Sequence, residues 1–203
     1  MKHKKTLIFT VFIFIGICGF GQVQIENEII ASLIKSEFIQ IPNDTIFNKK
    51  GEIKKIRISA KPEINLIQTT ETFLFDSHAD SLGMFKNNGL PSLDSECHND
   101  FIEKNKSKIK IDTIPDFNGT INYLTSEEIK LVFKQGGWEN YHKLYEFRPL
   151  VKISRPGLNK EKNEAFIYYS SLTDGLAGTG WYLLLKKVDN KWILIESMLS
   201  WIA

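Results

Sequence analysis

Asp76, His78 and Asp80 alternate along one short segment of the chain. On an extended strand, residues two apart project from the same face, so these three side chains would point the same way. With His98 from a later helix, they would offer the oxygen and nitrogen ligands that Zn²⁺ or Mn²⁺ accepts. One hypothesis is therefore a metal-assisted hydrolase. The alternative is a polar loop, because the spacing matches no known ligand motif.

Cys97 and His98 form a second candidate, a thiol beside an imidazole. Neighbouring residues on a helix point about 100° apart, so the imidazole would not face the thiol that it must activate. Cys97 also shares an apolar helix face with Leu93 and Phe101. We predict a buried, unreactive cysteine. The Gly-x-Ser-x-Gly signature of many serine hydrolases does not occur, and no cofactor is expected.

A glycine-rich segment, residues 175–180, lies between two expected strands. A phosphate-binding loop leads from a strand into a helix, so this segment does not fit one. We expect a long hairpin loop in which glycines adopt positive φ and which can touch a ligand. The candidate ligand-binding residues are the polar, aromatic and glycine positions in and near this loop: Trp138, Tyr141, Arg155, Asp174, Gly178, Gly180 and Trp181. The alternative is that the aromatic side chains fill the core.

The first 21 residues are typical of an export signal. Three lysines precede an apolar run, Leu7–Ile17, and Gly19 and Gly21 supply the small residues that a signal peptidase reads. The run is shorter than the roughly 20 residues that span a bilayer. We expect cleavage after Gly21 and a periplasmic or secreted protein of bacterial origin. A lipid anchor at Cys18 is the minor alternative.

Cleavage would leave a single domain, residues 22–203, with a looser subregion at 22–90. Loss of three signal lysines would lower the formal net charge from +2 to −1. Because no basic block remains to contact phosphates, nucleic acid is not an expected partner. No second apolar run is long enough to span a membrane. The expected partner is an unknown small molecule or an envelope protein.

The periodicity predicts an α+β fold that begins with a helix. Apolar residues recur every three or four positions from Ile25 to Phe38, which indicates an amphipathic helix. A mixed middle part follows, with short strands around residues 53–58, 64–67 and 73–75. A helix capped by Ser92 and a strand at Ile109–Ile114 come next.

The second half predicts helices packed on a four-stranded antiparallel meander. Thr125 and Glu128 form a capping box at the start of a helix that Gly136 and Gly137 end, and a short helix follows from Trp138. The strand period then begins, with a hairpin turn at Asp189-Asn190. The expected strands are Arg148–Arg155, Ala165–Leu172, Trp181–Val188 and Trp192–Trp201. Both faces of the last strand are apolar, so we expect strands from residues 43–75 to cover its second face.

Several short motifs mark the C-terminal third: Ser154-Arg155-Pro156, the glycine-rich segment, Leu184-Leu185-Lys186, Lys191-Trp192 and Trp201-Ile202. In these motifs the chain resembles uncharacterised exported proteins of Bacteroidota. That resemblance implies export and carries no activity. A fainter similarity is to the nuclear-transport-factor-like cone fold, with helices before a curved antiparallel sheet. It implies a small-ligand-binding domain with a pocket between the Trp138 helix and the final sheet.

The leading hypothesis is an exported, non-enzymatic binding or envelope-associated module. The sequence offers good fold signals and no convergent titratable cluster. The metal-assisted hydrolase and the small-ligand cone remain the alternatives.

Overall fold

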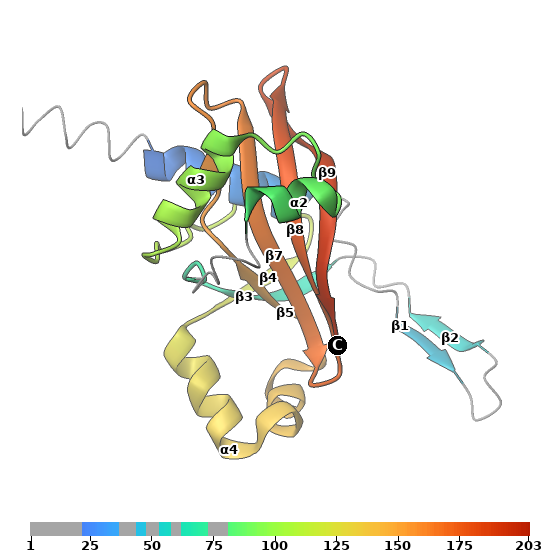
Figure 1. Cartoon of the computed structure of the whole chain (residues 1–203). Coiled ribbons are helices and arrows are strands. Elements are labelled where there is room, and N and C mark those ends of the chain that lie inside the picture. Colours follow the sequence, from blue (N-terminus) through green and yellow to red (C-terminus); the bar gives the residue numbers. More distant parts are fainter. Residues whose placement is uncertain (1–21, 37–43, 48–52, 58–61, 73–80) are drawn as a thin grey trace, which may run out of the picture.

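The computed structural model describes residues 22–36, 44–47, 53–57, 62–72 and 81–203. The expected export signal and the strand at residues 73–75 lie outside these residues. The fold is α+β, as predicted (Figure 1). Its elements are a helix at residues 22–35, here called the N-terminal helix, then β1 (Asp44–Phe47), β2 (Ile53–Arg57), β3 (Glu63–Ile67), α2 (Leu82–Asn87), α3 (Ser95–Lys104), β4 (Thr120–Leu124), α4 (Ser126–Tyr145), β5 (Leu150–Ile153), β6 (Gly157–Leu158), β7 (Glu164–Asp174), β8 (Ala177–Val188) and β9 (Lys191–Ile202).

A seven-stranded mixed sheet forms the centre of the molecule, in the order β4-β3-β5-β7-β8-β9, with β6 paired to β7. The run β5-β7-β8-β9 is antiparallel and confirms the predicted meander. Its last turn has positive φ at both Asp189 and Asn190, as a tight hairpin requires. The sequence did not predict that β3 lies parallel to both β4 and β5.

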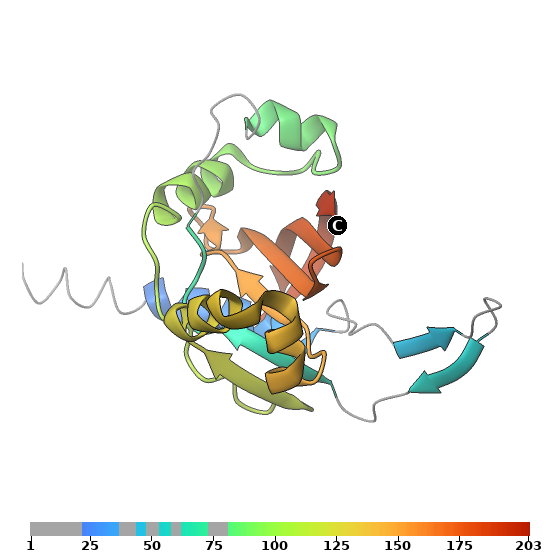
Figure 2. The same cartoon turned by 90° about the horizontal axis from the view of Figure 1, so that it is seen from below.

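Helices cover both faces of the sheet, and Figure 2 shows the sheet between them. The N-terminal helix packs on one face through four side chains that are at most 2% exposed: Ile29, Ile30, Leu33 and Ile34. α2 and α3 pack on the other face, where Phe85 and Phe101 contact Phe166 of β7. This two-sided cover explains why the central strands are apolar on both faces.

α4 follows the predicted pattern closely. Thr125 and Glu128 form both arms of the capping box. Gly136 and Gly137 have non-helical backbone angles, so they divide α4 into two helical halves. The helix packs on the ends of β3, β4 and β5 through Ile129, Val132 and Tyr141.

Three sequence expectations were wrong in detail. α3 is capped by Asp94 rather than Ser92, because the Asp94 carboxylate accepts a hydrogen bond from the Glu96 amide. The expected strand Ile109–Ile114 makes only an isolated bridge from Lys110 to Thr69. Residues 63–67, which we expected to cover the second face of the last strand, form β3 instead. β3 has a parallel partner at each edge, β4 on one side and β5 on the other.

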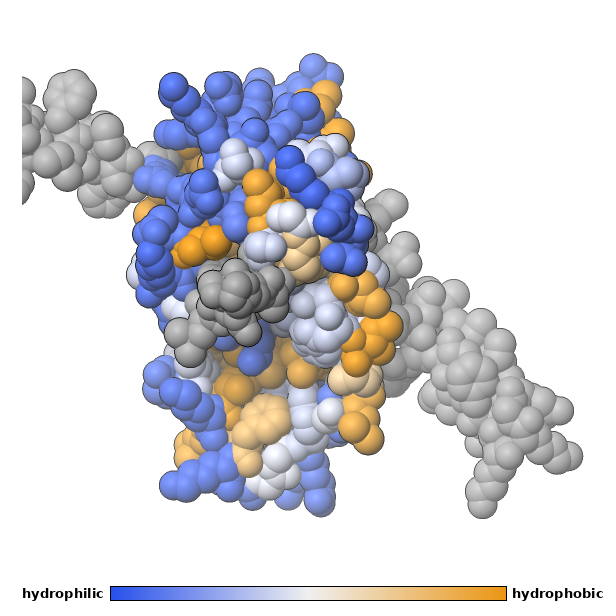
Figure 3. Space-filling model, viewed as in Figure 1, coloured by the Kyte–Doolittle hydropathy of each residue, from blue (hydrophilic) through white to orange (hydrophobic). Residues whose placement is uncertain are grey.

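β9 therefore keeps an uncovered side among the described residues. Ile193, Ile195 and Leu199 are each about two-fifths exposed, and Ile202 is 70% exposed. Figure 3 shows hydrophobic residues along this edge of the molecule. β9 is also an edge strand, and extra residues interrupt its pairing with β8 at Ile195 and Ser200. Such bulges twist an edge and disfavour strand addition.

A buried ion cluster joins the N-terminal helix to α3 and to the chain after β5. Glu26 is 0% exposed. Its carboxylate accepts from the Arg155 guanidinium at 2.9 and 3.1 Å and lies 3.3 Å from Lys104 Nζ. Lys104 also pairs with Asp100 at 2.6 Å and donates to the Pro156 carbonyl. Arg155, predicted as a ligand-binding candidate, is thus engaged within the protein.

We expect Glu26→Gln to destabilise the fold by about 3–5 kcal/mol, because it leaves Arg155 without its carboxylate and Lys104 with Asp100 alone. The measurement is the free energy of unfolding in urea. Glu28→Gln is the matched control, since the Glu28 pair with Lys187 is largely exposed and such pairs contribute under about 1 kcal/mol. Equal losses for the two variants would contradict a special role of Glu26.

Candidate functional site

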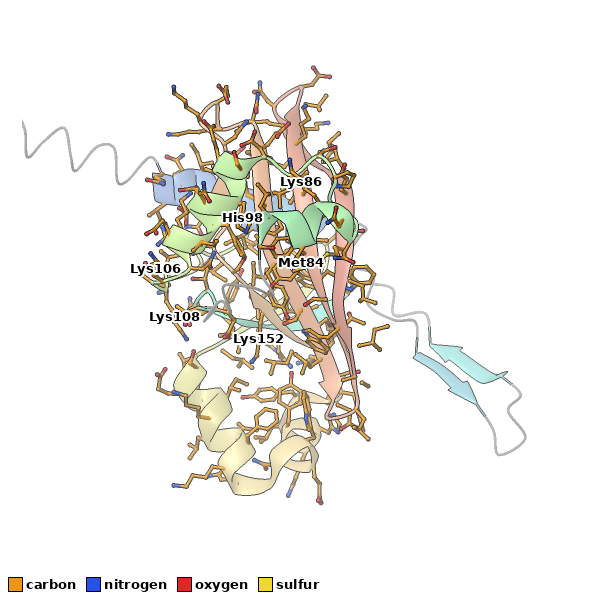
Figure 4. All side chains as sticks on the ribbon, viewed as in Figure 1. Met84, Lys86, His98, Lys106, Lys108 and Lys152 are labelled. Atoms are coloured by element: carbon orange, nitrogen blue, oxygen red, sulfur yellow. The ribbon has the colours of Figure 1, made fainter. Side chains whose placement is uncertain are left out.

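The predicted metal ligands are only partly described. Asp76, His78 and Asp80 lie outside the described residues. His98 lies on α3, is 6% exposed, and has its ring 5.6 Å from the ring of Phe85 (Figure 4). Within the described part of the chain, no group of three or more His, Cys, Asp or Glu side chains could hold a metal. The metal hypothesis stays a prediction.

Cys97 is buried, as predicted. Its side chain is 0% exposed and its thiol donates to the Glu164 carbonyl at 3.5 Å. Burial, reinforced by the nearby carboxylate of Glu164, raises the pKa of the thiol to about 12. At neutral pH the thiol therefore keeps its proton, and a protonated thiol is a poor nucleophile.

The glycine-rich segment is strand rather than the long loop that the sequence suggested. β7 runs to Asp174 and β8 begins at Ala177, so a two-residue turn joins them. The glycines of this segment do not have positive φ. The Asp174 carboxylate accepts from the Gly175 amide and so closes the turn.

The glycines are instead required because Trp201 packs directly against the strand at Gly178 and Gly180. A Cβ at Gly180 would overlap the indole nitrogen of Trp201 and lie 2.6 Å from the Tyr168 hydroxyl. That indole nitrogen donates to the same hydroxyl at 2.7 Å. A Cβ at Gly178 would lie 3.2 Å from the Trp201 ring. The face of Gly178 and Gly180 that we expected to meet a ligand is thus occupied by Trp201.

Trp138 approaches the neighbouring turn in the same way. Its ring lies 3.0 Å from the place that a Cβ would take at Gly175. The next turn of the helix brings His142, whose Nε2 lies 2.7 Å from the Thr173 carbonyl oxygen. These two contacts fix the second half of α4 against the β7–β8 turn.

Phe147 completes what we call the aromatic strip, the side chains of Trp138, His142 and Phe147. The His142 and Phe147 rings stack with centroids 4.1 Å apart, and the His142 and Trp138 centroids are 5.8 Å apart. Phe147 is nevertheless 65% exposed. The strip presents an aromatic surface that ends at the β7–β8 turn.

The backbone at Phe147 is held in an unusual state. Glu146 and Phe147 have φ of 55° and 61°, the left-handed region that side chains other than glycine and asparagine rarely adopt. For a bulky residue this conformation costs about 1–2 kcal/mol. It persists because the surrounding contacts, including the Glu146 amide to the His142 carbonyl, impose it.

Tyr141 supports the strip from inside the protein. It is 0% exposed, and burial raises its pKa. Its hydroxyl accepts from Asn65 Nδ2 at 2.6 Å and donates to the Arg148 carbonyl at 2.9 Å. Asn65 in turn accepts from Asn122 at 3.0 Å. This polar chain ties α4 to β3 and β4, so the strip stands on a rigid base.

Two exposed leucines belong to the elements that carry the strip or contact it. Leu144 of α4 is 55% exposed, and Leu176, in the β7–β8 turn, is 89% exposed. Leu176 follows Gly175, which Trp138 contacts. Exposed apolar side chains grouped around a rigid aromatic surface are typical of interaction sites.

The seven predicted ligand-binding residues do not form one site. Trp138, Tyr141 and Asp174 come together at the junction of α4 and the β7–β8 turn. Trp181 is half-buried with the core cluster of the N-terminal helix. The sequence analysis missed His142, Phe147 and Leu176. The one signal for Phe147 is its place just before Arg148-Pro149, where a helix must have ended.

Two polar groups of this junction are engaged within the protein: the Tyr141 hydroxyl in the polar chain and His142 Nε2 at a backbone carbonyl. The surface that remains is aromatic and apolar. Such a surface contributes binding energy through the apolar area that a partner buries on it and through stacking with the partner's rings.

We expect Gly180→Ala to destabilise the protein by about 1–3 kcal/mol, because the added methyl must displace Trp201. The loss should appear as a lower urea midpoint and a shifted tryptophan emission. Gly83→Ala is the control: nothing lies within 4 Å of its Cβ, so it should be stabilising by about 0.4–1 kcal/mol. Similar stability for both variants would refute the account of the glycine-rich segment.

Comparisons with known proteins add no family to this description. No family model, no curated protein and no solved structure matches the chain.

Proposed function

We propose that the chain is an exported, non-enzymatic binding domain that docks an envelope protein through the aromatic strip. The single observation that carries the proposal is Phe147, a large aromatic residue that is 65% exposed in left-handed backbone. A strained residue that the fold maintains without burying is a common feature of binding sites. Core packing does not explain it, because most of the ring faces solvent.

The geometry favours a protein partner over a small ligand. The Tyr141 layer beneath the strip is fully buried and hydrogen-bonded, so the strip is backed by packed core. An open hollow of about 300 Å³ among the described residues is lined by other elements, α3 and the β6–β7 turn. Exposed apolar side chains such as Phe147 and Leu176 are suited to the apolar centre of a protein interface.

Export is supported by the sequence of residues 1–21, with its lysines, its apolar run and its small residues before Gln22. Among the described helices, none is both long and apolar enough to cross a bilayer. The two observations agree with a domain that acts outside the cytoplasm.

Export predicts a defined product. When the full chain is expressed in a bacterium with an intact secretion pathway, the purified protein should have the mass of residues 22–203. Intact mass spectrometry distinguishes the outcomes. A mass that retains residues 1–21 would contradict export, and a diacylglyceryl group at Cys18 would replace cleavage after Gly21 with a lipid anchor.

Partner docking predicts that Phe147→Gly weakens binding without unfolding the domain. Glycine accepts the left-handed backbone, so the strain relieved roughly offsets the lost stacking, and stability should change by under about 1 kcal/mol. A photo-crosslinking residue in place of Leu176 should form one adduct with an envelope protein in intact cells. Phe147→Gly should lower its yield by about tenfold, as truncation of an interface anchor does.

Leu131→Ala is the matched control, because Leu131 is 55% exposed on the first half of the same helix, away from the strip. It should leave the adduct unchanged, and mass spectrometry identifies the partner. Two results would overturn the proposal: an adduct that is insensitive to Phe147→Gly, or an equal loss with Leu131→Ala.

A further inference from the structure

A hollow of about 300 Å³ lies where α3 meets the turn between β6 and β7. Its volume is at the lower end of the range for small-molecule sites, about 300–1,000 Å³. We call it the α3 hollow. Its lining combines two carboxylates, two lysines, two amides and an apolar side chain: Glu96, Asp100, Lys160, Lys162, Gln22, Asn159 and Leu158.

Hydrogen bonds between α3 and the facing backbone hold the walls of the α3 hollow, whose Glu96, Lys160 and Lys162 side chains are exposed. Glu96 and Asp100 lie one helical turn apart on α3, and each uses one oxygen to hold the opposite wall. Glu96 Oε2 accepts from the Lys160 amide at 2.9 Å, and Asp100 Oδ2 accepts from the Leu158 amide at 2.7 Å. A Cβ at Gly157 would overlap the α3 backbone, so β6 lies directly against the helix.

The turn that carries the two lysines is equally fixed. Asn159 Oδ1 accepts from the amides of Asn163 and Glu164, both at 3.0 Å, and Asn159 Nδ2 donates to Asn163 Oδ1. The Lys162 amide donates to the Asn159 carbonyl. Because the backbone is already ordered, little conformational entropy would be lost when a ligand binds.

The charged groups facing the hollow are not paired with one another, although Asp100 Oδ2 also pairs at 2.6 Å with Lys104, which does not line the hollow. Glu96 Oε1 and Asp100 Oδ1 accept no hydrogen bond from the described residues, and Lys160 and Lys162 form no ion pair with them. Opposite charges that share one hollow without contact leave a gap that a bridging molecule can close. Its ammonium would meet the carboxylates and its carboxylate would meet the lysines.

We infer that the α3 hollow binds a small zwitterion of the amino-acid type. The two free carboxylate oxygens on α3 receive the ammonium, the Lys160 and Lys162 ammonium groups receive the carboxylate, and Leu158 lies beside the ligand's side chain. The elements of this site are separate from the aromatic strip, so the inference does not depend on the proposed protein partner.

The test is a titration of the purified protein with L-leucine, followed by the amide NMR shifts of residues 96, 100, 160 and 162. The shifts should move together and saturate. L-leucinamide lacks the carboxylate and N-acetyl-L-leucine lacks the ammonium, so each should bind at least about tenfold more weakly, as loss of a charge-assisted contact implies.

Glu96→Gln keeps an oxygen that can accept from the Lys160 amide while it removes the charge, and it should weaken L-leucine binding by about tenfold. Glu103→Gln is the control, because Glu103 lies on the same helix and pairs with Lys106 in solvent. Unchanged shifts away from the hollow show that each variant is folded. The inference is overturned if leucine produces no saturable shift, if leucinamide or N-acetylleucine binds as tightly, or if Glu96→Gln binds like the native chain.

Discussion

The buried carboxylate of Glu26 is the interaction on which the arrangement of the elements depends. Removing a charge from water costs several kcal/mol, and only close opposite charges and hydrogen bonds offset that loss. Glu26 meets this condition because Arg155 and Lys104 both reach it. Arg155 follows β5, and Lys104 lies at the end of α3, which packs on the opposite face of the sheet from the N-terminal helix that carries Glu26. The N-terminal helix, α3 and the sheet therefore have to assemble together.

The aromatic strip depends indirectly on that assembly, because the sheet positions the β7–β8 turn that α4 packs against. Once both sheet faces are covered, β7 and β8 stay paired up to their shared turn, with one irregularity between Leu172 and Asp174, and Gly175 has no side chain to keep Trp138 away. The second half of α4 is then held by two contacts. His142 contacts the β7–β8 turn, and Tyr141 is hydrogen-bonded to Asn65 of β3. Phe147 has no freedom to relax, because its helix is fixed before it and Arg148 is bonded to Glu63 after it.

Local signals explain which parts of the fold were predictable. The capping box at Thr125, the break at Gly136 and the turn at Asp189 each act within a few residues, so the sequence displays them directly. The parallel pairing of β3 and the contact of Glu26 with Arg155, 129 residues apart, depend on the whole chain. The glycine-rich segment was mispredicted as a loop because its conformation also depends on a distant part of the chain. Glycine is needed there because a distant tryptophan approaches, and a sequence pattern cannot distinguish that need from positive φ.

The candidate site was half predictable for a related physical reason. Aromatic spacing identified Trp138 and Tyr141, but it could not show that Tyr141 is buried while Phe147 is exposed, because a helix's direction relative to the sheet decides that. The difference matters for function. A buried aromatic with a bonded hydroxyl stabilises the fold, whereas an exposed aromatic in left-handed backbone destabilises it. Within the described chain the His142 stack offsets part of that loss, and the exposed face of the Phe147 ring is the part that the proposed partner would cover.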